Sequence, residues 1–384
     1  MKSNSRYRPD LSKSIEVFGP IGEELVSHLA PKILALRHSN AETITAYINS
    51  TGGELRCLRY IYDLIKSPSP DGHSPHLITV GIGNVGSAAA ALLGLGDYSI
   101  AYPGAGIHFH GARFFDVSEV TVESASRLAN QLQESNQNMA SNLAKGSCER
   151  LAFRYWTFTN AMESDRKAKL NDAHENKDSS TISIDQFSTL IKENLSVTGM
   201  RIVRSAMKRW NDLRKISDKV KKDLDPKLQG IDFEAEILRR IITFEAERNK
   251  AAGNVSWNVA QIPTDFFLLK EYDTGDHHQF YQKIVERFGD AFFTADEAKK
   301  LRETKDTPEG DSLFLSKVNE TVLPFCYFAA SICLILHQQE NPLSAEDAYW
   351  LGEVDEIYGS DLPCVRVLDE QAEAMAEKES DKQP

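Results

Sequence analysis

PHLITVGIGNVGSAAAALLGLG, residues 75–96, predicts a strand that passes through a glycine-rich turn into a helix, with Ser87 at the turn. Residues 76–80 are apolar and β-branched and are bounded by proline and glycine, which is typical of a short buried strand. Residues 88–95 are small, apolar and strong helix formers, so they indicate a buried helix. The Ser87 hydroxyl is therefore expected at a helix amino terminus, where free N–H groups and the helix dipole stabilise negative charge. That location suits a nucleophile and its oxyanion.

The same residues also spell GxGxxG, the fingerprint of a dinucleotide-binding turn. Such a site needs an acidic residue about 20 positions later, at the end of the next strand, to hold the ribose. The nearby acid, Asp97, precedes the next strand, Tyr98–Tyr102, and the sequence that follows that strand, GAGIHFHGARFF, contains no acid. A dinucleotide site is therefore the weaker alternative.

The composition indicates a two-unit protein of 384 residues with a formal net charge of -12. The acidic balance argues against non-specific nucleic-acid binding, which needs a basic surface. Five scattered cysteines without a CxxC pair indicate reduced thiols and no zinc site. The amino terminus has no apolar signal segment, and Leu323–Leu336 is shorter than the roughly 20 residues of a membrane span. We expect a cytoplasmic protein with no metal, cofactor, nucleic acid or membrane partner.

Residues 14–110 alternate between strand and helix patterns, which predicts an α/β layer of parallel strands joined by crossover helices. The expected strands are Ser14–Val17, Thr43–Ile48, His76–Val80 and Tyr98–Tyr102, and the expected helices are Gly22–Arg37, Leu55–Lys66 and Ala88–Leu95.

The pattern changes after His110. Val117–Leu143 predicts a long helix, and the charged stretch 161–183 predicts a surface loop. Residues 184–336 are mostly helical by period, and the acidic end of the chain is typical of a disordered tail.

Three motifs could supply a nucleophilic site. Ser87 is a weak nucleophile until a base takes its proton, so it needs a histidine within hydrogen-bond reach. In GIHFHGAR, His108 and His110 alternate along an extended segment and should point to the same face. We interpret His108 as a structural or surface histidine. In NSTGGEL, Gly52 and Gly53 open a turn whose N–H groups could donate to an oxyanion.

AYINSTGGELRCLRYIYDLIKS, VGIGNVGSAAAALLGLG and AYPGAGIHFHG, in that order, resemble the proteolytic subunit of Clp protease, within the crotonase-like superfamily. PLSAEDAYWLGEVDEI, residues 342–357, is similar to the closing segment of that family. The resemblance implies an α/β fold with a crotonase-like, Clp-protease-like ββα core. The implied division of the chain is a discontinuous core over 14–149 and 340–366, an inserted mainly helical domain over 150–339, and an acidic tail over 367–384.

The resemblance implies a serine peptidase that uses a Ser-His-acid triad. The nucleophile falls on Ser87 and the base on His110, and the oxyanion donors fall on the backbone N–H groups of Gly53 and Ala88. The acid falls on Glu340, although the family usually has aspartate there.

Asp290 is an alternative acid, because DAFFTADEA has the same motif shape. We prefer Glu340, since only the copy of the motif that follows Glu340 continues into GEVDEI.

The family forms rings of subunits, so the resemblance also implies a homo-oligomer that acts on peptides or unfolded proteins. The long amino-terminal segment that forms the family's axial loop is largely absent, which argues against docking of an AAA+ unfoldase. HGARFF also lacks the proline that the family has shortly after its histidine. Two alternatives remain open: a scaffold with a degraded triad, and a crotonase-type enzyme acting on an acyl-CoA.

Overall fold

The computed structural model describes residues 8–39, 41–69, 72, 74–114, 121–170, 184–224, 236, 295–304, 307–317, 323–338 and 340–364. The chain divides into two compact units. The first comprises residues 1–110, 194–199 and 339–384, and the second comprises residues 111–193 and 200–338.

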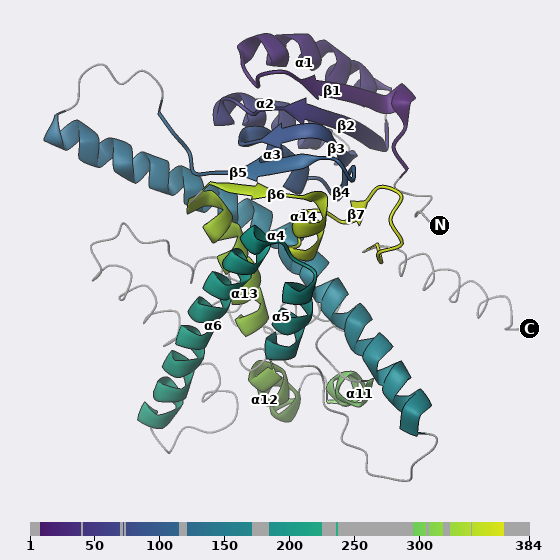
Figure 1. Cartoon of the computed structure of the whole chain (residues 1–384), viewed down its shortest axis with the longest axis vertical. Coiled ribbons are helices and arrows are strands. Elements are labelled where there is room, and N and C mark those ends of the chain that lie inside the picture. The colour runs from purple at the N-terminus through teal and green to yellow at the C-terminus, as the bar shows by residue number, and fades with distance from the viewer. Residues whose placement is uncertain are drawn as a thin grey trace, which may run out of the picture. The chain divides into compact units, whose positions relative to one another are not determined.

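A seven-stranded mixed sheet forms the centre of the first unit (Figure 1). Five parallel strands follow one another in the order β1-β2-β3-β4-β7, while β5 pairs in parallel with the far end of β3 and β6 pairs antiparallel with β5. The strands are β1 Ser14–Phe18, β2 Thr43–Ser50, β3 His76–Gly86, β4 Tyr98–Ala101, β5 Gly106–Phe109, β6 Asn341–Leu343 and β7 Glu356–Ile357.

Helices connect the parallel strands, which confirms the predicted α/β alternation. They are α1 Glu23–His38, α2 Leu55–Lys66, α3 Ala88–Gly94 and α14 Ala345–Trp350, preceded by the short 3-10 helix Leu11–Lys13. Every residue of α3 is buried, because its small side chains allow the helix to pack closely against the sheet. The predicted bounds of α2 coincide with the observed ones.

The predicted end of the third strand at Val80 is wrong, because β3 continues to Gly86. Its first part pairs with β4 and its last residues, Asn84–Gly86, pair with β5, so hydrogen bonds on both stretches keep the glycine-rich segment extended. Gly86 is needed for close packing, because a Cβ there would lie 2.9 Å from the backbone oxygen of Thr51. A segment inside a strand cannot form the phosphate-binding turn of the dinucleotide alternative.

Asp97 also has a structural role. Its Oδ2 accepts hydrogen bonds from the backbone N–H of Leu77 and from Lys66 Nζ, each at 2.7 Å, and so links α2 to the start of β3.

The segment Asn194–Gly199 belongs to the first unit, although the residues on either side of it belong to the second. Asp347 of α14 is buried and accepts two hydrogen bonds from this segment: from Ser196 N at 2.9 Å and from Ser196 Oγ at 2.5 Å. A Cβ on Gly199 would lie 2.5 Å from Asp347 Oδ1, so a glycine is required at that position. The loop is therefore fixed to α14 by a buried carboxylate.

The described secondary-structure elements of the second unit are helices. They are α4 Val122–Leu170, α5 Ile184–Glu193, α6 Val197–Asp223 (whose first three residues belong to the first unit), α11 Ala295–Glu303, α12 Pro308–Lys317 and α13 Leu323–Gln338. Aromatic rings from α4, α5 and α13 form part of the core, since the ring centroids of Tyr155, Phe187 and Phe325 lie 5.4 to 6.0 Å apart. Phe325, Phe328 and Ile332 are buried, so α13 is a core helix.

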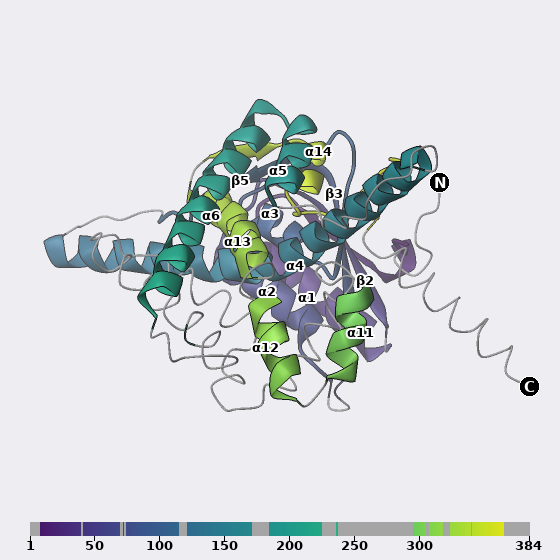
Figure 2. The same ribbon diagram turned by 90° about the horizontal axis from the view of Figure 1, so that it is seen from below.

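The predicted surface loop at 161–183 is wrong as far as Leu170, because α4 continues to that residue. Residues 161–170, AMESDRKAKL, are mostly strong helix formers, and this propensity outweighs their polarity. The rest of that prediction lies outside the described residues. Figures 1 and 2 show α4 changing direction near its middle, where Gly146 and Ser147 lie. Such Gly/Ser pairs are a common cause of helix kinks.

Within the described ranges, every helix is too short or too polar to cross a membrane.

Candidate functional site

Ser87 has a strained backbone at the junction of β3 and α3, with φ 53° and ψ −122°. Among the described residues, Ser87 is the only residue other than glycine that has a positive φ. Its N–H donates to the carbonyl of His108 at 2.7 Å, and its carbonyl accepts from Ala91 N at 3.1 Å in the first turn of the helix. These two bonds hold the residue in a conformation that costs about 1–3 kcal/mol, and strain of this kind is concentrated at functional sites. In α/β-hydrolases, strained strand-to-helix turns present a serine nucleophile.

The turn at Gly52 and Gly53 lies directly against Ser87, so the structure brings two of the predicted motifs together. Gly52 has a φ of 95°, and a Cβ there would lie 2.5 Å from both Gly86 O and Ser87 Cβ and 2.9 Å from Ala88 N. Only glycine allows this approach, because any side chain would displace the serine turn.

The two predicted oxyanion donors, the backbone N–H groups of Gly53 and Ala88, both lie at this junction. Ala88 is the first residue of α3, and N–H groups of a first helical turn have no acceptor within their helix. Gly53 forms a parallel bridge with Ile21 in which Ile21 N donates to Gly52 O at 2.9 Å and Glu54 N donates to Ile21 O at 2.8 Å. In this pattern the Gly53 N–H points to the side of its chain opposite Ile21.

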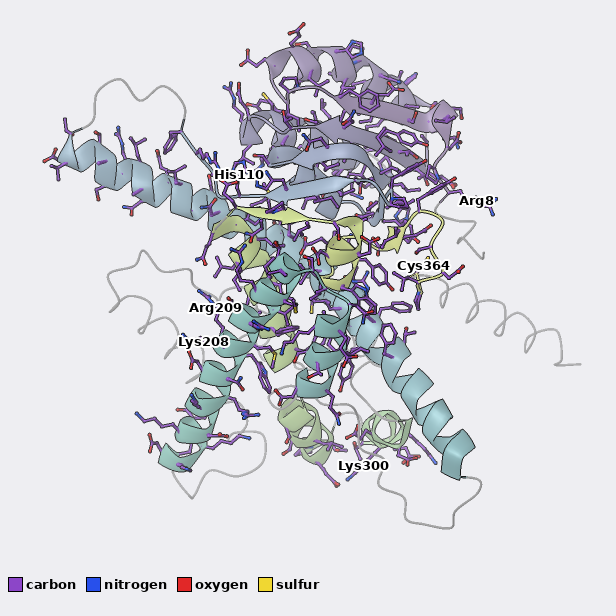
Figure 3. All side chains as sticks on the ribbon, viewed as in Figure 1. Arg8, His110, Lys208, Arg209, Lys300 and Cys364 are labelled. Atoms are coloured by element: carbon purple, nitrogen blue, oxygen red, sulfur yellow. The ribbon has the colours of Figure 1, made fainter. Side chains whose placement is uncertain are left out.

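The two histidines share one face of β5, as their spacing predicts. Ile107 and Phe109 are buried, whereas His108 and His110 are half-buried on the other side of the strand. The two imidazole centroids lie 5.7 Å apart with an interplanar angle of 59°. Figure 3 shows His110 at the end of β5.

Glu340 reaches this face from the start of β6. The antiparallel register pairs His108 with Pro342 and Phe109 with Asn341, so one further step would place Glu340 opposite His110. The Glu340 carboxylate also contacts the other histidine: its Oε2 lies 2.8 Å from His108 Nε2.

The contact between Glu340 and His108 is the part of the site that sequence reasoning missed. The available signal was the i, i+2 spacing of the two histidines, which places both within reach of one carboxylate. Asp290, the alternative acid, lies outside the described residues. Within the ranges that the structure covers, no group of three His, Cys, Asp or Glu side chains is arranged to hold a metal ion.

Comparison with known proteins identifies relatives of the amino-terminal region. Residues 7–176 match the family described as Clp protease. Over 81 residues the chain is 35% identical to the ATP-dependent Clp protease proteolytic subunit 3 of Rhizobium johnstonii, 33% identical to that of Rhizobium etli and 32% identical to that of Rhizobium meliloti.

Each of these alignments covers 21% of this chain and 39% of the relative, so the chain spans about two fifths of the length of the relatives that it matches. The family implies the α/β fold that the first unit displays. The predicted resemblance is therefore confirmed: the chain is related to the Clp protease family through residues 7–176.

Proposed function

We propose that the protein is a serine peptidase of the Clp type, with Ser87 as the nucleophile and His110 as the general base. The observation that carries this proposal is the strained backbone of Ser87, a residue pinned at the start of a buried helix and packed against a glycine turn. A serine required only for packing has no need of a positive φ, which glycine would adopt without strain.

The reaction would be acyl transfer. His110 takes the proton from Ser87 Oγ, which attacks the carbonyl carbon of a peptide bond. The N–H groups of Gly53 and Ala88 donate to the developing oxyanion. His110 then gives its proton to the departing amine, and water releases the acyl group from Ser87 by the same steps.

Glu340 would be the acid that orients His110 and stabilises its protonated form. The register of β5 and β6 supports this role, because its continuation places Glu340 across from His110. Glutamate is one methylene longer than the usual aspartate, so its carboxylate can also reach a diagonal neighbour on β5.

The substrates would be peptides or unfolded protein segments, handled by a homo-oligomeric ring in the cytoplasm. We propose that residues 14–149 and 340–366 form the peptidase core and that 150–339 is an inserted helical domain. The mainly helical second unit supports the insertion. By resemblance, the helix predicted over Val117–Leu143 corresponds to the element through which rings of the family stack. Because α4 continues from it to Leu170, into the insertion, the insertion would alter contacts between rings. An AAA+ unfoldase would not be the obligatory partner.

Hydrolysis of fluorogenic peptides and unfolded casein, together with labelling by a fluorophosphonate, tests the proposal. The wild-type chain should hydrolyse and become labelled, and Ser87→Ala should lose both while keeping its circular dichroism spectrum. Ser39→Ala, which changes an exposed serine after α1, is the matched control and should keep both activities.

Labelling that persists in Ser87→Ala would contradict the proposal. A wild-type chain that is neither labelled nor active would favour a scaffold. Saturable coenzyme A binding without labelling would favour the acyl-CoA alternative.

A further inference from the structure

His108 connects three parts of the candidate site. Its carbonyl oxygen accepts the Ser87 N–H at 2.7 Å, its Nε2 lies 2.8 Å from Glu340 Oε2, and its ring centroid lies 5.7 Å from that of His110. The first of these contacts uses the backbone and survives any substitution. The second uses the side chain alone, so a substitution of His108 can remove the contact with Glu340 while the backbone bond to Ser87 is kept.

The contact with Glu340 is a diagonal one across two strands. Directly opposed residues have Cβ atoms about 4.5–5.5 Å apart, whereas diagonal neighbours are about 7–8 Å apart and are bridged only by long side chains. The imidazole of His108 and the carboxylate of Glu340 together span this distance, since their nearest atoms lie 2.8 Å apart.

The fold does not depend on this ion pair. The side chains of His108 and Glu340 are 39% and 57% exposed, and exposed pairs of this kind contribute little to stability. The strand is held instead by its pairing with β3 and β6 and by the buried side chains of Ile107 and Phe109. The contact with His108 restricts the rotamers that the Glu340 side chain can adopt.

We infer that His108 is a positioning residue: its Nε2–H holds one oxygen of Glu340 and so fixes the carboxylate on the face of β5 that carries His110. Held in this way, the carboxylate would act on His110, which lies across from Glu340 when the β5–β6 register is continued by one step. This inference rests on the proposed peptidase function, and it assigns a role to a residue that does not itself touch the substrate.

The test measures kcat and KM separately for His108→Ala, His108→Gln, Glu340→Gln and the double variant His108→Ala/Glu340→Gln. His108→Ala should lower kcat about tenfold with KM nearly unchanged, which is within the range for coupled neighbouring residues. His108→Gln should recover most of the loss, because its amide N–H can donate to the same oxygen. The double variant should be no slower than Glu340→Gln alone, since without the carboxylate His108 has nothing to position.

His76→Gln is the matched control. His76 Nδ1 lies 4.0 Å from Asp97 Oδ2 at the start of β3, so this change also removes an exposed histidine beside an acid, at the opposite end of the strand from Ser87. It should leave kcat unchanged.

Three results would overturn the inference: an unchanged or raised kcat in His108→Ala, a failure of His108→Gln to recover activity, or additive losses in the double variant. If His108→Ala unfolds, His108→Gln and Glu340→Gln still decide between positioning and no role. Failure of the peptidase proposal is a separate result, because it would appear as activity or labelling that survives Ser87→Ala.

Discussion

Replacing Ser87 by glycine should stabilise the protein relative to replacing it by alanine. Alanine keeps the Cβ and therefore the strained backbone with φ 53°, whereas glycine adopts that conformation freely. Relief of about 2 kcal/mol of strain is offset by about 0.75 kcal/mol of extra chain entropy, which leaves a net gain of about 1 kcal/mol. At about 2–4 °C per kcal/mol, the transition of the first unit should rise by about 2–4 °C.

Thermal and urea unfolding of the two variants, measured side by side, would give this difference. Ser27, exposed within α1, supplies the control pair, because glycine in an ordinary helix is less stable than alanine by about 1 kcal/mol. The sign of the difference should thus reverse between the two sites. Equal stability of Ser87→Gly and Ser87→Ala, or a less stable glycine variant, would show that Ser87 is not strained. Both variants should be inactive, so stability and activity are read independently.

Three further predictions concern the surroundings of the site and the core. Gly52→Ala should lower the free energy of unfolding by at least about 2 kcal/mol and remove most of the activity, because its Cβ would lie 2.5 Å from neighbouring atoms. Gly72 has a similar positive φ but open space around it, so Gly72→Ala should lower the free energy of unfolding by only about 1 kcal/mol and leave the activity unchanged. Ser196→Ala should lower the free energy of unfolding by about 1.5–3 kcal/mol in urea titrations, since it removes a hydroxyl bond to the buried Asp347 carboxylate, and an unchanged midpoint would contradict that role. Burial raises the pKa of Tyr98 far above the ordinary value near 10, and so does the charge of Glu356, which accepts the Tyr98 hydroxyl bond. The free energy of unfolding should therefore keep the full contribution of Tyr98 below pH 10 and fall by about 1.4 kcal/mol per pH unit above it. In Tyr98→Phe, urea titrations above pH 10 should show a smaller fall per pH unit.

Local patterns were sufficient where one element's own residues decide its structure. The bounds of α2 follow from a strongly amphipathic segment, and the buried α3 follows from its run of small apolar residues. The adjacency of Ser87 and the Gly52–Gly53 turn was also predictable, because parallel strands end at the same edge of a sheet.

Features that depend on distant pairing were not predictable from local patterns. Glycines at the end of β3 are typical of a turn, and only their hydrogen bonds with β5 keep them extended. The contact between His108 and Glu340 depends on the register between two strands that are far apart in the sequence, and neither strand's composition specifies it.

The buried bond between Asp347 and Ser196 restricts how the chain could be shortened. The long excursion between β5 and β6 is fixed to α14 at residues 194–199 as well as at its two ends, so it cannot be treated as a detachable appendage. A minimised protein that joined residue 110 directly to residue 340 would lose both hydrogen bonds that Ser196 donates to the Asp347 carboxylate. It would also lose the segment that packs against this carboxylate, since a Cβ on Gly199 would lie 2.5 Å from Asp347 Oδ1. A shortened protein should therefore keep residues 194–199 as part of the first unit.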